Sequence, residues 1–470
     1  MASTAQAATG GENDYKKHPG ARILRGPHKT IGGAEAWMVW GLCTVFVVWL
    51  FSIQTGYAVV SPEIQKTASL TVAQIGLAGS IYTWAFALCQ FFSGALLDRF
   101  GSRPLLAIAV AFVTAGAFLY AQTDSMATLI AAQIVLAIGS SFGFVGAGYI
   151  GGQWFPAARY GLMFGLVQSL ASLGSAFGQP AISWQLQHVT WQQLLNGFGA
   201  GGVVLIVLFV LLVRNPSTGP AQLAQTTARP SRPPLVSSIL RDLGTCFRNR
   251  NVVLSAALAG VSFGSMLAMG VLWGPRIMEA RGAGTSLAAV LTAMSWLGLA
   301  VGAPLFNLLS DHWNNRRIPA VVGVLLQAAA VSLLIYLPKE TNSVSVVTMF
   351  CVGLFAGAHM LGFTVAGESV PGALVGSSAA IVNGICFIVG GLLQAIPGRI
   401  LPDSPSLGDY GGALLMMPIL LVLGALAGFF IKDTAKARVD AQRRPRPTAP
   451  GTVGRDATGR RVRRCRSLRP

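Results

Sequence analysis

Long apolar runs separated by short polar connections cover most of this 470-residue sequence. Many of the runs reach about 20 residues, the length that an α-helix needs to cross the hydrocarbon of a bilayer. The pattern predicts an all-α membrane protein with twelve transmembrane helices. The expected spans lie at about residues 36–60, 72–97, 104–122, 126–150, 161–184, 192–213, 252–275, 285–309, 318–337, 344–367, 374–396 and 410–431.

The composition agrees with a membrane protein. Hydrophobic residues make up 53% of the chain and charged residues 11%, whereas soluble domains carry about a quarter charged residues. The 56 glycines also fit, because small residues let membrane helices approach closely. No apolar core followed by a small-residue cleavage site precedes the first run, so we expect that run to be a retained span and not a cleaved signal peptide.

The distribution of Lys and Arg predicts the orientation. With the N-terminus inside, the inner loops hold eleven Lys and Arg and the outer loops hold five. Cytoplasmic loops are normally the richer in these residues. We therefore expect a multi-pass protein of a bacterial-type inner membrane, with both termini cytoplasmic.

The net charge of +18 is concentrated in the tails. Thirteen Lys and Arg follow position 431, in a Pro- and Gly-containing tail without apolar periodicity. Such a tail suits anionic lipid headgroups; RNA is an alternative, but no nucleic acid is expected as a partner. The predicted parts are a basic tail (1–34), a six-helix half (35–214), a linker (215–250), a second six-helix half (251–431) and a disordered basic tail (432–470). Within the linker, LVSSILRDLGTCF is a candidate amphipathic helix.

Catalytic and metal-binding chemistry finds little support in the sequence. The six cysteines are scattered, with no CxxC motif, and four lie in apolar runs where Cys usually acts as a small hydrophobe. No Ser-His-Asp set, metal-ligand spacing, paired carboxylates within spans or nucleotide-binding loop is apparent. We expect no enzyme activity, no metal and no cofactor.

Two landmarks recur at nearly one offset and indicate an internal repeat. Asp98 and Asp311 each end an apolar run, with an Arg five residues later, and they lie 213 residues apart. Pro156 and Pro371 each precede small residues and a Gly-bearing apolar run, and they lie 215 residues apart. Secondary transporters are often built from such repeats, so we predict two homologous, pseudo-symmetric halves.

The stretch GALLDRFGSR resembles the motif that the major facilitator superfamily carries after its second helix. The matching residues are Gly94, Asp98, Arg99, Gly101 and Arg103. Ser102 departs from the pattern, and the second copy keeps only Asp311 and Arg316. The resemblance implies a conformational latch that holds one half against the other. Asp98 is expected to pair with Arg103 or with a neighbouring helix end; positive-inside anchoring alone would explain the arginines but not Asp98.

In that family, spans one, two, four and five face spans seven, eight, ten and eleven across a central cavity. Polar residues inside apolar spans are costly, so those on the facing spans are candidates for binding solute. The predicted cavity residues are Gln54, Tyr57, Tyr82, Gln133, Tyr149, Gln168, Trp273, Trp296 and Asn383.

His359 and Glu368 are candidates for proton coupling. His359 lies well inside a span, and the unperturbed pKa of His, about 6.5, suits a proton-linked step; a neutral His bonded to a neighbouring helix is an equal alternative. Glu368 follows near the end of the same span, where capping of the next helix is the plainer interpretation. Gln133 stands where many family members have an Arg, which argues against the commonest coupling arrangement.

The sequence thus predicts a monomeric secondary transporter for a small polar or anionic organic solute, driven by proton symport or by exchange. Its Gly-rich loop WFPAARYGLMFG and the aromatic and amide residues of the expected cavity resemble the organic-anion and sugar-phosphate permeases of the family. Efflux of amphipathic drugs or siderophore-like compounds is the alternative, which an aromatic cavity would favour. A transporter-like sensor or assembly factor is a further alternative, of another class.

Overall fold

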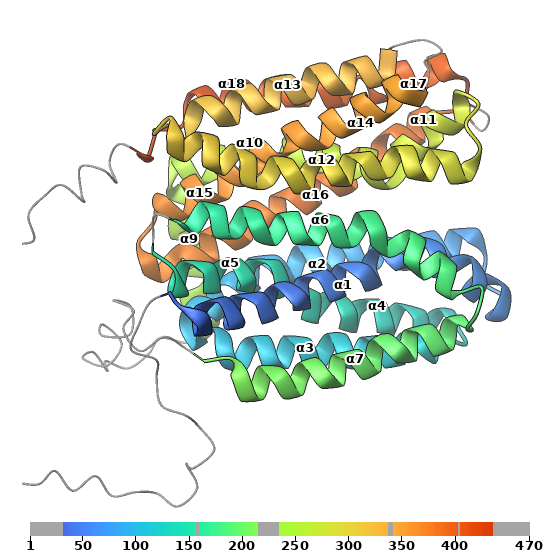
Figure 1. Ribbon diagram of the computed structural model, residues 1–470, viewed down its shortest axis with the longest axis horizontal. Helices are drawn as coiled ribbons and strands as arrows, with labels where there is room; N and C mark the ends of the chain where they lie inside the picture. The colour runs from blue at the N-terminus through green and yellow to red at the C-terminus, as the bar shows by residue number, and fades with distance from the viewer. Residues whose placement is uncertain (1–31, 157–158, 215–234, 337–341, 403–404, 436–470) are drawn as a thin grey trace, which may run out of the picture.

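A computed structural model describes residues 32–156, 159–214, 235–336, 342–402 and 405–435 of the chain (Figure 1). Twelve helical segments among these residues are long and apolar enough to cross a membrane, as the sequence predicts. The fifth of them, Tyr160–Gln185, is helical although Gln168, Gln179 and Pro180 interrupt its apolar sequence.

The first half of the chain forms seven helices that make six spans. They are α1 (Ala34–Thr67), α2 (Val72–Phe100), α3 (Ser102–Ala121), α4 (Met126–Ser140), α5 (Gly143–Trp154), α6 (Tyr160–Gln185) and α7 (Trp191–Leu212). The fourth span is α4 and α5 together. Side-chain caps begin several of these helices at the far end of the bundle: Thr71, Ser125 and Thr190 each accept a hydrogen bond from the third residue of the helix that follows.

The second half of the chain repeats this plan with more interruptions. After the linker helix α9 (Leu235–Arg248), its elements are α10 (Arg250–Ala268), the π-helical turn η2 (Met269–Trp273), α11 (Gly274–Ala280), α12 (Thr285–His312), α13 (Arg317–Tyr336), α14 (Asn342–Ala356), the 3₁₀ turn η3 (Gly357–His359), α15 (Met360–Glu368), the 3₁₀ turn η4 (Gly372–Leu374), α16 (Val375–Ile400), α17 (Leu407–Leu414) and α18 (Met416–Phe429). Pro275 at the start of α11 follows the π turn, where the regular helix is already broken.

The two halves lie side by side, with α1 to α7 below and α10 to α18 above in Figure 1. α6 packs along α12 and α2 packs along α16, and these two pairs form most of the boundary between the halves. α1 begins and α18 ends at the same end of the bundle, which we call the termini face; the opposite end is the far face. This arrangement of twelve spans in two halves, among the described residues, is the predicted architecture.

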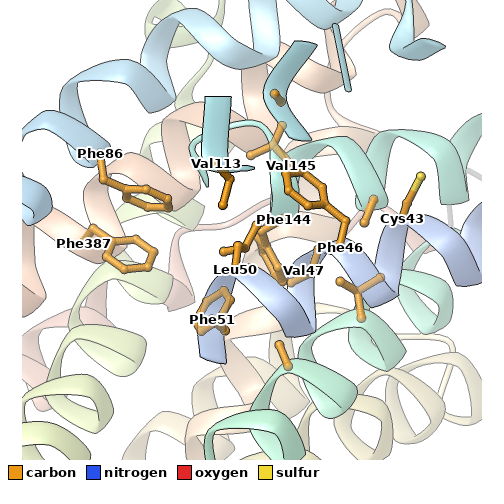
Figure 2. Close-up of a cluster of buried hydrophobic side chains, with 14 of the residues drawn as sticks. Cys43, Phe46, Val47, Leu50, Phe51, Phe86, Val113, Phe144, Val145 and Phe387 are labelled. Carbon is orange, nitrogen blue, oxygen red and sulfur yellow. The ribbon is translucent and has the colours of Figure 1, made fainter. Parts of the chain in front are cut away.

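Buried side chains form two apolar clusters. One fills the first half and continues across the boundary to residues such as Phe387 of α16, and Figure 2 shows this part with Phe86 and Phe387 facing each other. The other cluster lies within the second half. Glycines allow close helix contacts: a Cβ on Gly353 of α14 would lie 1.7 Å from the carbonyl oxygen of Ser295 in α12. Such contacts explain part of the high glycine content.

The predicted helix within the linker is present as α9, at the termini face beside α2 and α16. Ile239, Leu243 and Cys246 are buried on one side of it, while Val236 and Leu240 are exposed on the other. The rest of the predicted linker, 215–234, lies outside the described residues, as do most of the predicted basic tails.

Candidate functional site

A cavity of about 540 Å³ lies between the two halves. Its lining comes from the later part of α1, the early part of α2, the end of α3 and the later half of α4 in the first half of the chain. The second half contributes the end of α10, η2, the middle of α12 and the later half of α16. Because α1 starts and α2 ends at the termini face, this lining extends from the middle of the bundle toward the far face. The volume lies within the range that small-molecule sites occupy.

Five of the nine predicted cavity residues line this cavity: Gln54, Tyr57, Tyr82, Gln133 and Trp296. Tyr57 donates a hydrogen bond to the carbonyl of Ile75 at 2.6 Å, which fixes its ring in the wall. Trp296 donates to the carbonyl of Gly270 at 3.3 Å across the gap between α12 and η2. The structure thus places these five residues at the cavity wall, and their contact with a solute stays a prediction.

The other four predicted cavity residues are placed elsewhere. Trp273 is fully buried and donates to the carbonyl of Leu393 at 2.9 Å. Gln168 donates to Ser172 one turn along α6 at 3.1 Å. Tyr149 and Asn383 lie outside the cavity lining, toward the termini face from it. In this conformation α6 and α15 pack against the opposite half, so spans five and ten contribute no lining residue among those described.

Several lining residues were missed by the sequence reasoning. Tyr120 ends α3, a span that the family resemblance placed away from the cavity, yet its ring stacks on Tyr57 with centroids 6.2 Å apart. Ser140 enters the lining where α4 ends at the break before α5. The Gly and Ser residues around this break were the one sequence signal for Ser140, and no sequence signal pointed to Tyr120.

Aromatic rings close the cavity on the side of the termini face. Phe86 of α2 and Phe387 of α16 come from opposite halves, and their ring centroids are 4.5 Å apart (Figure 2). Phe263 of α10 lies 5.7 Å from Phe387. Nearer the termini face, Phe363 of α15 contacts Phe164 of α6 at 4.9 Å, again across the boundary. These paired rings form two successive apolar seals.

His359 lies within the second half between these two seals. Its side chain is 1% exposed, and its ring lies 5.0 Å from Phe263 and 6.0 Å from Phe363. Its Nδ1 is 2.7 Å from the carbonyl oxygen of Ala356. His359 is therefore outside the cavity lining in this conformation, and its role in proton coupling stays a prediction.

Asp98 joins the two halves at the termini face. Its carboxylate accepts hydrogen bonds from the backbone N–H of Gly376 at 3.0 Å and from the N–H and hydroxyl of Ser377, each at 2.8 Å. These N–H groups belong to the first turn of α16, where backbone donors lack helical partners and the helix dipole favours an anion. The sequence left two partners open for Asp98, Arg103 or a neighbouring helix end. In the structure its partner is a helix end, the start of α16.

Gly94 makes this contact sterically feasible. A Cβ on Gly94 would lie 2.0 Å from the carbonyl oxygen of Gly376, so only glycine allows α2 and α16 to approach so closely. Gly101, which ends α2, has a φ of 79°, a conformation that L side chains rarely adopt. Gly94 thus allows the two helices to pack closely, and Gly101 allows the chain to turn after α2.

The motif arginines bind neighbours on the same face. Arg99 donates to the hydroxyl of Ser238 in α9 at 2.5 Å. Arg103 donates to the carbonyl of Val210 in α7 at 3.3 Å. Arg99 therefore fixes α9 against the end of α2.

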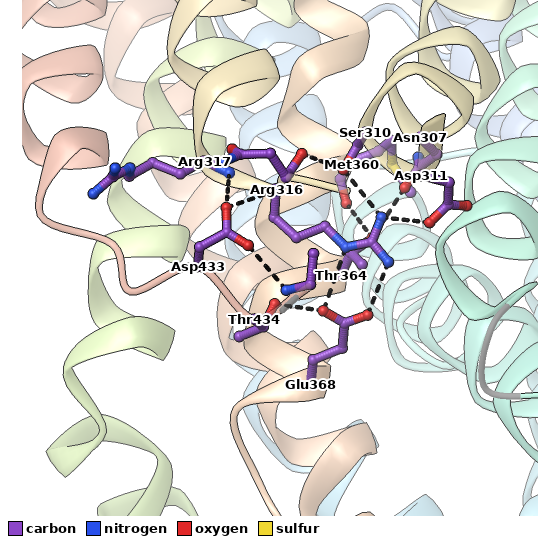
Figure 3. Close-up of polar contacts among 12 residues, drawn as sticks. Asn307, Ser310, Asp311, Arg316, Arg317, Met360, Thr364, Glu368, Asp433 and Thr434 are labelled. Atoms are coloured by element: carbon purple, nitrogen blue, oxygen red, sulfur yellow. Dashed lines mark hydrogen bonds and ion pairs between the residues drawn. The ribbon is translucent and has the colours of Figure 1, made fainter. Parts of the chain in front are cut away.

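The second copy of the motif forms an ion-pair network centred on Arg316 (Figure 3). The Arg316 side chain is 3% exposed and lies 2.6 Å from Asp311 and 3.1 Å from Glu368. Burial opposes the charge on Arg316, but both carboxylates outweigh it and raise its pKa. Thr434 donates to Glu368 at 2.5 Å, and Asp433 accepts from the backbone N–H of Arg316 at 2.9 Å.

This network differs from the Asp98 contact because all of these partners lie in the second half. It ties together the end of α12, the start of α13, the end of α15 and the chain after α18. Glu368, predicted as a proton carrier or a helix cap, is placed in an ion pair with Arg316. Asn307, at the repeat position of Gly94, instead accepts a hydrogen bond from Thr364 at 3.0 Å.

Comparisons with known proteins agree with this architecture. A sequence model described as the Major Facilitator Superfamily matches residues 40–395. The chain is 22% identical to the uncharacterized transporter YybO of Bacillus subtilis, over 86% of this chain and 95% of that protein. It is 24% identical to the probable sulfoacetate transporter SauU of Cupriavidus necator, over 84% and 93%. It is 20% identical to the probable galactarate/D-glucarate transporter GarP of Escherichia coli, over 82% and 92%.

Proposed function

The chain belongs to the major facilitator superfamily, and we propose that it is a secondary active transporter for a small polar or anionic organic solute. It would act by alternating access in a bacterial-type inner membrane, as a monomer, with proton symport or exchange as the driving process. The relatives named as a probable sulfoacetate transporter and a probable galactarate/D-glucarate transporter support the solute class. Because the cavity lies between the two halves of one chain, a monomer has a complete site.

The observation that carries the proposal is the asymmetric closure of the cavity. Aromatic contacts and the Asp98–α16 contact join the halves on the side of the termini face, whereas the cavity extends toward the far face. With both termini cytoplasmic, this conformation is the outward-facing state. Breaking the Asp98 contact and separating the two aromatic seals would lead to the inward-facing state.

Proton coupling through His359 fits the same cycle. The ring lies between Phe263 and Phe363, and Phe363 contacts Phe164 of the other half. Separation of the halves at Phe363 would admit water to the imidazole. Protonation would then favour the conformation in which the ring is hydrated, because a buried cation without a partner is costly.

Transport by the purified protein is the direct test. Liposomes containing only this protein and preloaded with unlabelled sulfoacetate, galactarate, glucarate or a broader solute panel should accumulate the matching labelled solute by exchange. The same uptake should respond to an imposed pH gradient if protons are coupled. Uptake no faster than in protein-free liposomes, for every solute, would instead favour a sensor or assembly role.

Efflux of amphipathic compounds is the second candidate, and the aromatic composition of the cavity wall favours it. Trp84 lines the cavity and adds an indole ring to its wall. Inverted and right-side-out vesicles distinguish the two directions: import requires net movement toward the termini face under a physiological gradient, and efflux requires the reverse.

A further inference from the structure

The wall of the cavity combines stacked aromatic rings with uncharged polar groups. Tyr57 and Tyr120 lie nearly parallel, at an interplanar angle of 20°, and Trp84 and Trp296 add indole rings. Aromatic faces bind flat apolar or aromatic parts of a ligand by stacking. This part of the wall therefore suits a solute with a flat apolar portion.

The polar part of the wall consists of amides and hydroxyls. Gln54, Gln133 and Gln394 supply amides, and Ser80, Ser140 and Thr83 supply hydroxyls. Every described residue of the lining is uncharged at neutral pH. Amides and hydroxyls both donate and accept hydrogen bonds, so the wall matches groups that do the same.

Four polar atoms at this wall are covered by their surroundings and have no hydrogen-bond partner. They are Oε1 of Gln54, Nε2 of Gln133 and the hydroxyls of Tyr82 and Tyr120. An unpaired buried donor or acceptor is destabilising, and a solute that pairs with these atoms after small side-chain rotations removes that cost. The set includes an acceptor, a donor and two groups that are both.

We propose that the cavity takes an uncharged organic solute with a flat apolar part and a hydroxyl-bearing part. The inference rests on the proposed transport function and narrows its substrate class. A hydroxyl can donate to Gln54 and accept from Gln133, whereas a carboxylate only accepts. A carboxylate would also lose its hydration with no opposite charge in the described lining, which is far more costly than burying a hydroxyl. The chain thus differs from its relatives named for sulfoacetate and galactarate.

A matched pair of probes tests this inference. Phenyl β-D-glucoside and phenyl β-D-glucuronide differ only in that a CH₂OH group in the first is a carboxylate in the second at pH 7. Isothermal titration with the purified full chain should give a dissociation constant at least tenfold lower for the glucoside. Equal or tighter binding of the glucuronide overturns the inference, and so does the absence of binding by both.

Charge added to the wall should reverse the preference. Gln133→Arg places a cation at the wall, and Gln54→Arg does so at a half-buried position that tolerates charge more readily. Either variant should bind the glucuronide at least tenfold more tightly than the glucoside. The exposed control Gln185→Arg adds the same charge outside the cavity and should keep the original order. Unchanged order in folded Gln133→Arg and Gln54→Arg overturns the inference.

The proposed function is tested separately in the same preparation. Exchange of galactarate or sulfoacetate by protein that binds neither glycoside would leave transport standing and remove the uncharged-solute inference. Exchange of the labelled glucoside, with none of the glucuronide, would support both. Binding of the glucoside without exchange of any solute would support the binding inference and count against transport.

Discussion

The contact between Asp98 and the start of α16 offers a sharp test of the proposed cycle. Asp98→Asn keeps the size of the side chain but removes its charge and replaces one acceptor oxygen by a donor NH₂ group. The wild-type carboxylate accepts three hydrogen bonds, two from backbone N–H groups and one from the Ser377 hydroxyl. In the variant, the new NH₂ group faces at least one of these donors.

The expected cost follows from these contacts. A hydrogen bond to a charged group contributes about 1.5–3 kcal/mol, and an anion at a helix N-terminus adds roughly 0.3–1 kcal/mol. Because Asn retains part of the bonding, we expect the closed termini face to lose about 2–3 kcal/mol. That corresponds to a roughly 30- to 150-fold shift of the equilibrium toward the state that is open at this face.

Two measurements follow the shift. Spin labels at Phe100 and Trp313, which are 46% and 54% exposed at the ends of α2 and α12, report the opening of the termini face by electron–electron distance. They are placed in a chain whose six native cysteines have been replaced. Asp98→Asn should add a longer distance population. The rate of solute exchange should fall more than the binding affinity does.

Asp124→Asn is the matched control. It makes the same chemical change in the connection between α3 and α4 at the far face, where Asp124 accepts from Thr128 at 3.0 Å. The control should alter neither the distances nor the exchange rate. An unchanged distance distribution in Asp98→Asn would refute the latch, and equal losses of binding and rate would indicate misfolding instead.

Three further variants test other parts of the structure. Gly94→Val should also open the termini face in the spin-label assay, because its Cβ would lie 2.0 Å from the Gly376 carbonyl oxygen; retention of the closed distances would contradict the close approach of α2 and α16. His359→Gln should flatten the pH dependence of exchange while leaving solute affinity largely intact, and an unchanged pH profile would reject His359 as the coupling residue. Arg316→Gln removes the buried cation that pairs with Asp311 and Glu368 and should lower the free energy of unfolding by about 2–3 kcal/mol, measured by thermal or denaturant unfolding. Lys66→Gln, which breaks an exposed pair, should change it by less than about 1 kcal/mol, and equal effects of the two would show that the Arg316 network adds no special stability.

The number and approximate positions of the spans could be predicted from the sequence. Crossing a bilayer requires about 20 apolar residues with internally satisfied backbone groups, so each span is a local property of the chain. Asp98 was equally conspicuous, because an acidic residue at the end of an apolar run has few structural explanations. A similar pattern recurs 213 residues later at Asp311, and this repetition in the sequence is enough to indicate two halves.

Only the tertiary structure decided which way each side chain faces. Membrane helices are apolar on most sides, so Gln168 and Gln133 have similar sequence surroundings, yet only Gln133 lines the cavity. The rotation of a helix about its axis is set by packing with its neighbours, as Trp273 shows by turning its indole to the Leu393 carbonyl. The repeat likewise could not reveal that Asp98 bridges the halves whereas Asp311 pairs within one of them. That difference depends on what lies opposite each carboxylate: Asp98 meets the start of α16, 278 positions away, whereas Asp311 meets Arg316, five positions away. Only the packing of the halves brings the start of α16 to Asp98.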